Sequence, residues 1–415
     1  MKRYRIPGML LAGFITCVFV VISCGGGGDS KEDFLYFRAD DGVNGRELWV
    51  YDGVNAPVMV ADINSAGDSN PSELMVFDDR LVFRAEDGDN GFELWSYDGN
   101  GDPSMVADIN PSGDAWPYGL IEYDGDLYFA ATNGMDGDPN SELWILDSSS
   151  GNAGMVTNIY KGTTFFQING GINDPAVYNG KLFFAMNDGI AGKELWSYDA
   201  DTGEALMAAD IWAGSATSHS LPFGLTVFRD KLFFNAGEPV YGEEMWVYDG
   251  ITAPDIVADI NSAGDSDPSY FFEFDGMLYF AADDGIHGEE LWSYDGLSVS
   301  PVMVADINTA GDFSPYYFAV FQDQLYFSAD DGSHGRELWT YDGLTSPTMV
   351  ADIDSVDESN AGDLAVFNEK LYFSANDGIN GRELWVYDGV NEPSLAADIY
   401  VGGHSQPSGL TVFRH

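Results

Sequence analysis

Apolar residues in this chain fall into short runs separated by clusters of Asp, Asn, Gly and Pro. One unit contains four such runs, Leu74–Phe77, Leu81–Ala85, Glu93–Tyr97 and Met105–Ile109. Runs rich in Val, Ile, Tyr, Phe and Trp between turn-forming clusters predict β-strands joined by tight turns. Because the runs do not alternate cleanly between apolar and polar residues, we expect both faces of each sheet to be buried.

The third run carries the motif Glu47-Leu48-Trp49-Val50-Tyr51-Asp52-Gly53, which returns seven more times. Its tryptophans are spaced 46 to 52 residues apart, at Trp49, Trp95, Trp144, Trp196, Trp246, Trp292, Trp339 and Trp385. A fixed period in this range is typical of repeat architectures. Four-stranded antiparallel sheets that are buried on both faces and repeat around an axis are the blades of a β-propeller.

The two ends of the chain carry complementary strands. The first predicted strand, at Leu35, is of the Leu-Tyr-Phe type, and the last, Leu410–Phe413, is of the Leu-Thr-Val-Phe type. Within each repeat these two types form one hairpin, so pairing of the chain ends leaves no open sheet edge. We therefore predict an all-β fold over residues 34–415, a single eight-bladed β-propeller of four-stranded antiparallel blades closed by pairing of the N- and C-terminal strands.

The repeated motif resembles a known family. The Glu-Leu-Trp-x-Tyr-Asp-Gly unit is similar to the ELWxxDGT repeat of bacterial surface and secreted proteins, although Val54 and Asn100 stand where that family has threonine. More broadly, Asn179–Phe184 with Glu194–Gly203 resembles the blade pattern of pyrroloquinoline-quinone-type propellers. The second resemblance implies that the Leu-Thr-Val-Phe strand is innermost and the Val-Ala-Asp-Ile strand outermost. The first implies a propeller without a settled activity.

The N-terminal segment predicts export. Lys2, Arg3 and Arg5 precede the uncharged run Ile6–Ile22, as in a secretory signal. Ser23-Cys24 then resembles the lipobox of bacterial lipoproteins, with Val21 where leucine is usual. We predict a signal peptide over 1–23, a lipidated Cys24 with a glycine-rich tether over 24–33, and anchoring at the outer membrane or cell surface. The alternative is an uncleaved signal anchor, because the run is near the short limit for a membrane-spanning helix.

The charge balance is strongly acidic. Asp and Glu number 68 and Lys and Arg 17, which gives a formal net charge of −51. Such a field repels nucleic acid and anionic lipid and favours cations or basic partners. We therefore expect no nucleic-acid binding, membrane contact only through the N-terminal lipid, and a monomer. Since 45% of the residues are hydrophobic, the acidity does not indicate disorder.

The loops between blades repeat the spacing Asp-x-Asn-x-x-Gly-Asp. Carboxylate and amide oxygens at this spacing could supply ligands to Ca²⁺, the one cofactor considered. The candidate ligands are Asp62, Asn64, Asp68, Asp108, Asn110, Asp114, Asp259, Asn261, Asp265, Asp306, Asn308 and Asp312. The alternative is that these side chains bond to nearby backbone amides and shape the turn, with the acidity reflecting a salt-adapted surface.

Histidines in the loops have a simpler interpretation. His287 and His334 stand where other copies have Asn44, Asn90 or Asn380. Exchange with asparagine indicates a turn residue that tolerates positive φ, not a metal ligand.

One sector departs from the repeat and gathers aromatic residues. Its loops carry the candidate partner-binding residues Trp116, Tyr160, Phe165, Phe166, Trp212 and His219, suited to a protein or glycan partner. The alternative is that they are buried in degenerate repeats. No nucleophile–base arrangement or phosphate loop stands out. We therefore predict a non-catalytic binding module and not an enzyme. The first alternative is a periplasmic scaffold resembling the propeller lipoprotein of the β-barrel assembly machine, and the second is a quinone-type or hydrolytic propeller enzyme.

Overall fold

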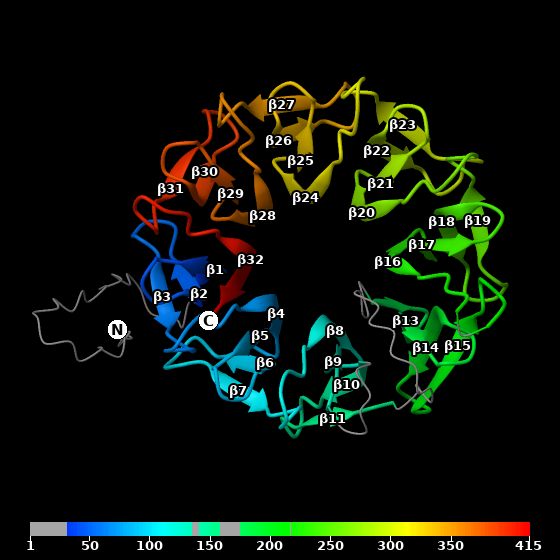
Figure 1. Ribbon diagram of the computed structural model, residues 1–415, viewed down its shortest axis with the longest axis horizontal. Helices are drawn as coiled ribbons and strands as arrows, with labels where there is room; N and C mark the ends of the chain where they lie inside the picture. Colours follow the sequence, from blue (N-terminus) through cyan, green and yellow to red (C-terminus); the bar gives the residue numbers. More distant parts are fainter. Residues whose placement is uncertain (1–30, 135–140, 158–174, 216) are drawn as a thin grey trace, which may run out of the picture.

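The computed structural model describes residues 31–134, 141–157, 175–215 and 217–415. This part of the chain is all β, and it contains no helix that is long and apolar enough to span a membrane. The predicted signal segment and Cys24 lie outside the described residues, so lipidation and export stay predictions. Figure 1 shows the strands arranged as blades around a central axis.

Eight four-stranded antiparallel sheets form the ring, which confirms the predicted eight-bladed propeller. The innermost strands are β4 (Ser72–Phe77), β8 (Tyr118–Tyr123), β12 (Ala176–Tyr178), β16 (Phe223–Phe228), β20 (Ser269–Phe274), β24 (Tyr316–Phe321), β28 (Gly362–Phe367) and β32 (Ser408–Arg414). The second strands are β1 (Asp33–Asp40), β5 (Arg80–Glu86), β9 (Asp126–Ala131), β13 (Lys181–Asn187), β17 (Lys231–Glu238), β21 (Met277–Asp283), β25 (Gln324–Asp330) and β29 (Lys370–Asn376).

The signature motif lies on the third strand of each blade, and the Val-Ala-Asp-Ile run begins with the fourth. The third strands are β2 (Arg46–Tyr51), β6 (Phe92–Tyr97), β10 (Glu142–Leu146), β14 (Lys193–Asp199), β18 (Gly242–Tyr248), β22 (Glu289–Tyr294), β26 (Arg336–Tyr341) and β30 (Arg382–Tyr387). The outermost strands are β3 (Val58–Ala61), β7 (Ser104–Ala107), β11 (Ala153–Met155), β15 (Glu204–Ala209), β19 (Asp255–Ala258), β23 (Val302–Ala305), β27 (Thr348–Ala351) and β31 (Ser394–Ala397).

The last strand closes the ring on the first blade. β32 pairs antiparallel with β1, Phe34 opposite Phe413 and Leu35 opposite Val412, so the sheet runs β3-β2-β1-β32. Arg414 donates two hydrogen bonds of 2.6 Å to the Asp33 carboxylate beside this pairing. The predicted closure by the chain ends is therefore confirmed.

The hydrophobic core lies between neighbouring blades. In one cluster Tyr36 and Leu48 pack against Phe83, Trp95 and Tyr97 of the next blade. Second and third strands are buried on both faces, as predicted, with patterns such as that of β21, where five successive residues are buried. Innermost and outermost strands are only partly buried, because one side of each faces the channel or the rim.

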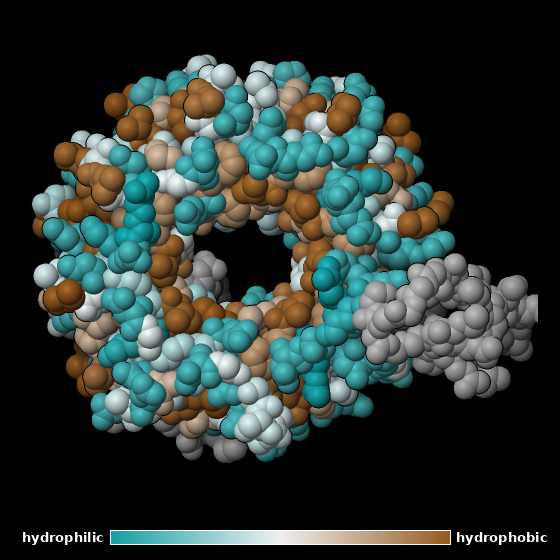
Figure 2. Space-filling model, turned by 180° about the vertical axis from the view of Figure 1, so that it is seen from behind, coloured by the Kyte–Doolittle hydropathy of each residue, from teal (hydrophilic) through white to brown (hydrophobic). Residues whose placement is uncertain are grey.

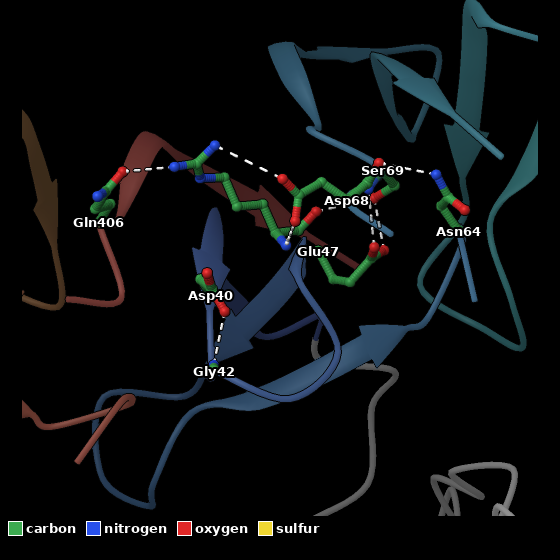
Figure 3. Close-up of polar contacts among 8 residues, drawn as sticks. Asp40, Gly42, Glu47, Asn64, Asp68, Ser69 and Gln406 are labelled. Carbon is green, nitrogen blue, oxygen red and sulfur yellow. Dashed lines mark hydrogen bonds and ion pairs between the residues drawn. The ribbon is translucent and has the colours of Figure 1, made fainter. Parts of the chain in front are cut away.

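The glutamate of the signature motif joins each blade to the loop that leaves it. Glu47 is fully buried, and its carboxylate accepts hydrogen bonds from Ser69 N (2.9 Å) and Ser69 Oγ (2.5 Å) (Figure 3). It also accepts a hydrogen bond from Ile63 N (2.9 Å). Glu194, Glu337 and Glu383 make the same set of contacts with Ser220, Ser359 and Ser405. Because a buried carboxylate needs several donors, this set of contacts fixes the path of the inter-blade loop.

Burial of these glutamates predicts an unusual dependence of stability on pH. Burial raises the pKa of Glu47, Glu93 and Glu290 to about 7, from 4.5. Between pH 4.5 and 7 the folded protein therefore binds more protons than the unfolded chain, so stability is full below 4.5 and is lost as pH rises through 7. Each glutamate contributes at most about 3 kcal/mol.

Asp388 and the other turn aspartates act in the opposite direction. Hydrogen bonds from Asn391 and Val390 lower the pKa of Asp388 to about 2, so its contribution to stability is lost as pH falls below 3.8.

We expect thermal unfolding at fixed ionic strength to show a maximum Tm near pH 5 and a clear fall by pH 8. Repetition in 1 M NaCl is the control, because salt screens the surface charge but not burial. A Tm that stays constant or rises between pH 5 and pH 8, both at the lower ionic strength and in 1 M NaCl, would contradict the prediction.

Candidate functional site

An open channel passes through the centre of the ring (Figure 2). We call the end at which the innermost strands begin the channel mouth. Each described innermost strand except β12 has a register shift near its start, for example between Ser72 and Met75 of β4. The second residue of each of these strands is therefore displaced from regular pairing with its neighbour.

This second residue has a left-handed backbone. Glycine occupies it at Gly119, Gly224 and Gly409, with φ from 64° to 66°. Side-chain-bearing residues occupy it in the other strands, at Glu73 (57°), Tyr270 (57°), Tyr317 (59°) and Asp363 (55°). A non-glycine residue in this conformation costs roughly 1–2 kcal/mol, and such outliers cluster at functional sites. Because several such residues gather at the channel mouth, we consider it the candidate functional site.

A hollow of about 900 Å³ lies at the mouth, over the starts of β16, β20 and β24. Tyr270 and Tyr316 lie 5.8 Å apart between ring centres, and Tyr317 packs on Tyr316 at 4.7 Å. The Arg336 guanidinium lies 4.1 Å above the Tyr316 ring and donates a 2.8 Å hydrogen bond to Ser314 O. The hollow therefore presents aromatic faces beside a fixed positive charge, an arrangement suited to a ligand with both apolar and polar parts.

Carboxyl groups form the other side of the hollow. Asp267 and Glu289 line it directly, and Glu243 lies next to Asp267. Burial, followed by the neighbouring Asp267 and Asp265, raises the pKa of Glu243 to about 7, and burial also raises that of Glu289. The Glu243 carboxyl group can therefore hold or release a proton near neutral pH, next to the Asp267 side chain.

The predicted calcium ligands build turns in the described residues. Asn64 Nδ2 donates to Asp68 O (3.0 Å), and its Oδ1 accepts from Ala66 N (Figure 3). Asp68 Oδ1 accepts a 3.0 Å bond from Arg46 N. The same contacts recur at Asn110 and Asp114, Asn261 and Asp265, and in part at Asn308 and Asp312.

The first aspartate of each predicted set stands apart from these bonds. The Asp62 Oδ1 atom is buried and has no hydrogen-bond partner in the structure, and Asp108, Asp259 and Asp306 occupy equivalent positions. No group of three or more His, Cys, Asp or Glu side chains in the described ranges could hold a metal. The described side chains bond to nearby backbone groups and shape the turn, which was the alternative to calcium binding. Calcium binding stays a prediction.

The loop histidines replace polar side chains of other copies. His287 Nδ1 contacts Asp284 Oδ2 at 2.8 Å, as Asn44 Nδ2 contacts Asp41 Oδ2 at 2.7 Å. His334 makes the same contact with Asp331. Their role as turn residues agrees with the sequence, but the reason given was wrong, because the positive φ angles in this loop belong to Gly285 and Gly288. The exchange with asparagine preserves a side-chain hydrogen bond.

Three of the six predicted partner-binding residues, Trp116, Trp212 and His219, lie in the described part of the chain. Tyr160, Phe165 and Phe166 lie outside the described residues. Trp116 is 43% exposed and stacks on Phe92 at 4.3 Å, with the Arg84 guanidinium 5.3 Å from its ring. Trp212 is half-buried, and its backbone nitrogen lies 3.5 Å from Glu194 Oε2. His219 Nδ1 accepts a bond from Lys193 N, the role that Asp68 has in the first blade.

The residues of the channel mouth were missed by the sequence analysis. A signal was present in seven of the eight repeats. The position four residues before the last aromatic residue of the innermost strand is Glu73, Gly119, Gly224, Tyr270, Tyr317, Asp363 or Gly409. At this position glycine is replaced in other repeats by tyrosine, aspartate or glutamate. Such an exchange indicates a left-handed backbone with room for a side chain of any size, here in the channel.

Comparisons with known proteins identify only the fold. No protein-family model and no curated protein sequence matches the chain. Among solved structures, it is similar to a puromycin-hydrolyzing peptidase from Mycobacterium tuberculosis, with a TM-score of 0.52 and 14% identity over 84% of this chain and 56% of that one. It is also similar to a prolyl endopeptidase (TM-score 0.51, 12% identity, 78% of this chain and 49% of that one). The chain thus spans about half the length of these two peptidases.

This finding corrects the predicted function. The sequence analysis predicted a non-catalytic binding module and not an enzyme, with an assembly scaffold as the first alternative and a quinone-type or hydrolytic propeller enzyme as the second. The two similar solved structures named above are instead peptidases, and this finding contradicts that prediction. That prediction depended on the lack of a recognisable catalytic motif. In a propeller, however, groups from different blades meet at the channel without any local sequence motif.

Proposed function

We propose that this protein is a hydrolytic propeller that acts on peptides taken in at the channel mouth. The hollow at the mouth carries this proposal, because aromatic rings, the Arg336 guanidinium and the Asp267 carboxyl group all line it. A peptide has apolar side chains, polar amides and charged groups. Tyr270 and Tyr316 offer apolar faces to the side chains, while the charged groups bind polar parts and fix orientation.

Hydrolysis of a peptide bond requires a group that takes a proton from water and a group that gives one to the leaving amine. A carboxyl group whose pKa lies near the working pH performs both transfers. Glu243, with its pKa of about 7, is paired with Asp267 at the edge of the hollow. We assign the proton transfers to this pair and substrate holding to Tyr270, Tyr316 and Arg336.

The similar solved structures support the choice of substrate class. They are a prolyl endopeptidase and a puromycin-hydrolyzing peptidase, and the present chain matches about half of each. Because identity is 12% to 14%, catalytic residues are not carried over from those proteins. The assignment above is made on the contacts of this chain alone.

The proposal predicts cleavage by the purified full-length chain of a mixed pool of synthetic peptides, followed by mass spectrometry. Glu243→Gln and Asp267→Asn should each lower the cleavage rate by about 100-fold or more, since general acid–base catalysis contributes 10²–10⁴-fold. Glu204→Gln, on the exposed outermost strand β15, is the matched control and should cleave like the unaltered protein. Absence of cleavage above the buffer rate, or equal rates in all four proteins, would falsify the proposal.

The repeat motif supports a finer relationship. We also propose that the chain is related to the ELWxxDGT repeat proteins, because eight tandem copies of Glu-Leu-Trp-x-Tyr-Asp-Gly or close variants occur on equivalent third strands. A profile built from these eight units should retrieve those proteins ahead of other propellers. Failure to retrieve them would remove the relationship without affecting the fold.

A further inference from the structure

Five arginines gather in one sector of the ring. Arg336, Arg382 and Arg46 begin the third strands β26, β30 and β2, while Arg38 and Arg84 lie near the ends of the second strands β1 and β5. These strands belong to four successive blades (Figure 1). The chain has only 17 basic residues against 68 acidic ones, so five arginines in one sector form a locally positive region in an acidic protein. We call these five residues the arginine cluster.

The side chains of the cluster reach inward to the channel mouth. Arg382 Nη2 donates a 2.7 Å hydrogen bond to Ser374 Oγ, and the same atom lies 3.4 Å from where a Cβ on Gly362 would stand, at the start of β28. Arg84 Nε donates to Ser72 Oγ (3.0 Å), at the start of β4. The guanidinium groups therefore lie above the first residues of the innermost strands.

Most of these positive charges have no carboxylate in contact. Of the five, only Arg46 forms an ion pair within the described part of the chain, at 3.7 Å from Asp68. The remaining hydrogen bonds of the cluster go to hydroxyl, amide and carbonyl oxygens, which are neutral. A partly buried guanidinium surrounded by neutral acceptors favours an added anion, because its desolvation is only partly compensated.

Arg38 carries the clearest unused donor. Its Nε–H is buried and has no hydrogen-bond partner in the structure. The charged groups that act on Arg38 are Arg46 and Arg84, which repel it, and Asp363 and Asp68, which attract it.

Asp363 lies near two members of the cluster. Arg382 Nη2 stands over the preceding residue, Gly362, and Arg38 is paired with Ser408, next to Gly409. Both arginines act on the Asp363 carboxyl group. It has a left-handed φ of 55°, and its Oδ1 accepts a 3.0 Å bond from Gly409 N. Burial outweighs both arginines and raises the pKa of Asp363. One carboxyl group thus stands among several guanidinium groups, and it is held by a backbone N–H of the neighbouring blade.

We propose that Arg38 and Arg382 bind a carboxylate group of a ligand at the channel mouth, beside Asp363, with Arg46 and Arg84 adding positive potential. Guanidinium groups present parallel N–H donors that match the two oxygens of a carboxylate. A dianionic phosphate would place two negative charges on one group next to Asp363, whereas a carboxylate places one there, so the site favours a carboxylate. This inference goes beyond the proposed hydrolysis, because carboxylate binding is measured with small acids that have no bond to cleave.

The test is isothermal titration calorimetry of the full-length protein with succinate, at an ionic strength held constant with sodium chloride. We expect saturable binding that weakens about tenfold or more in Arg38→Gln and in Arg382→Gln, the loss expected for one charge-assisted hydrogen bond. Asp363→Asn should bind succinate several-fold more tightly. It removes the competing charge, keeps an oxygen for Gly409 N, and tolerates the left-handed backbone.

Two controls keep the result interpretable. Arg80→Gln removes an exposed arginine from the β4–β5 turn, at the opposite end of the channel, and should bind like the unaltered protein. Melting curves of every variant establish that each one is folded. Equal binding by the unaltered, Arg38→Gln and Arg382→Gln proteins overturns the proposal, as does weaker binding by Asp363→Asn. Tighter binding of inorganic phosphate than of succinate excludes the carboxylate assignment.

Discussion

Removal of Leu410–His415 is expected to leave a protein that aggregates or loses at least about 5 kcal/mol of unfolding free energy. The deletion takes away most of β32 and exposes the paired edge of β1. Phe413 is 1% exposed and packs in the cluster formed with the second blade, while Leu410 and Val412 pack against the cluster formed with the last blade. Loss of one buried phenylalanine alone costs about 3–5 kcal/mol, against a total stability of about 5–15 kcal/mol.

Thermal melting followed by light scattering measures this effect. A deletion of equal length, Gly25–Ser30, removes residues of the predicted tether and serves as the control, which should melt like the full chain. Phe413→Ala should show an intermediate loss, because it keeps the backbone pairing with β1 and removes only the side chain. If the six-residue C-terminal deletion melts at the temperature of the control, the ring is not stabilised by this pairing.

Replacement of a signature glutamate should also destabilise the protein strongly. Glu47→Ala leaves Ile63 N, Ser69 N and Ser69 Oγ without their acceptor in a buried position. Each buried donor left unsatisfied costs about 1–3 kcal/mol, so we expect a loss of about 3–5 kcal/mol. Denaturant unfolding at pH 5 and at pH 8 measures it, and the loss should be smaller at pH 8, where the ionised buried carboxylate already destabilises the parent protein.

The repeat itself supplies matched comparisons for this prediction. In the second blade Ala115 replaces the serine, and Glu93 accepts bonds from Ile109 N and Asn110 N. Glu93→Ala should therefore cost less than Glu47→Ala, while Glu204→Ala on an exposed outer strand should fall within about 0.5 kcal/mol of the parent. Equal losses at Glu47 and Glu204 would show that the buried contacts do not stabilise the fold.

The fold was predictable because its determinants are local and are repeated eight times. Turn residues such as Asn179-Gly180, with φ angles of 48° and 71°, mark the hairpins directly in the sequence. The recurring tryptophan, Trp49 in the first copy, marks the third strand of every blade. The first and last strands of the chain are the two halves of one hairpin, which indicates that the chain ends pair. Short-range hydrogen bonding and inter-blade packing thus leave a periodic pattern that can be counted without coordinates.

The candidate site could not be read in this way. The contact of Glu47 with Ser69 joins residues 22 positions apart, and the glutamate appears in the sequence as one more acidic residue. Tyr270, Tyr317 and Asp363 owe their positions at the channel mouth to a left-handed backbone that the strand pattern does not reveal. Trp116 is exposed, as the sequence predicted, but its stacking on Phe92 and its contact with Arg84 join residues that are far apart in the sequence.

The arginine cluster shows most directly what only tertiary structure decides. Arg38 lies on β1 and Arg382 on β30, near opposite ends of the chain, yet both act on Asp363. They meet because β32 joins the first blade and brings it beside β28 of the last one. By itself the sequence determined the blades, their number and their order, since each blade follows from contacts within one repeat. Ring closure decided which charges share the channel mouth, because electrostatic interaction depends on distance in space and not on separation along the chain.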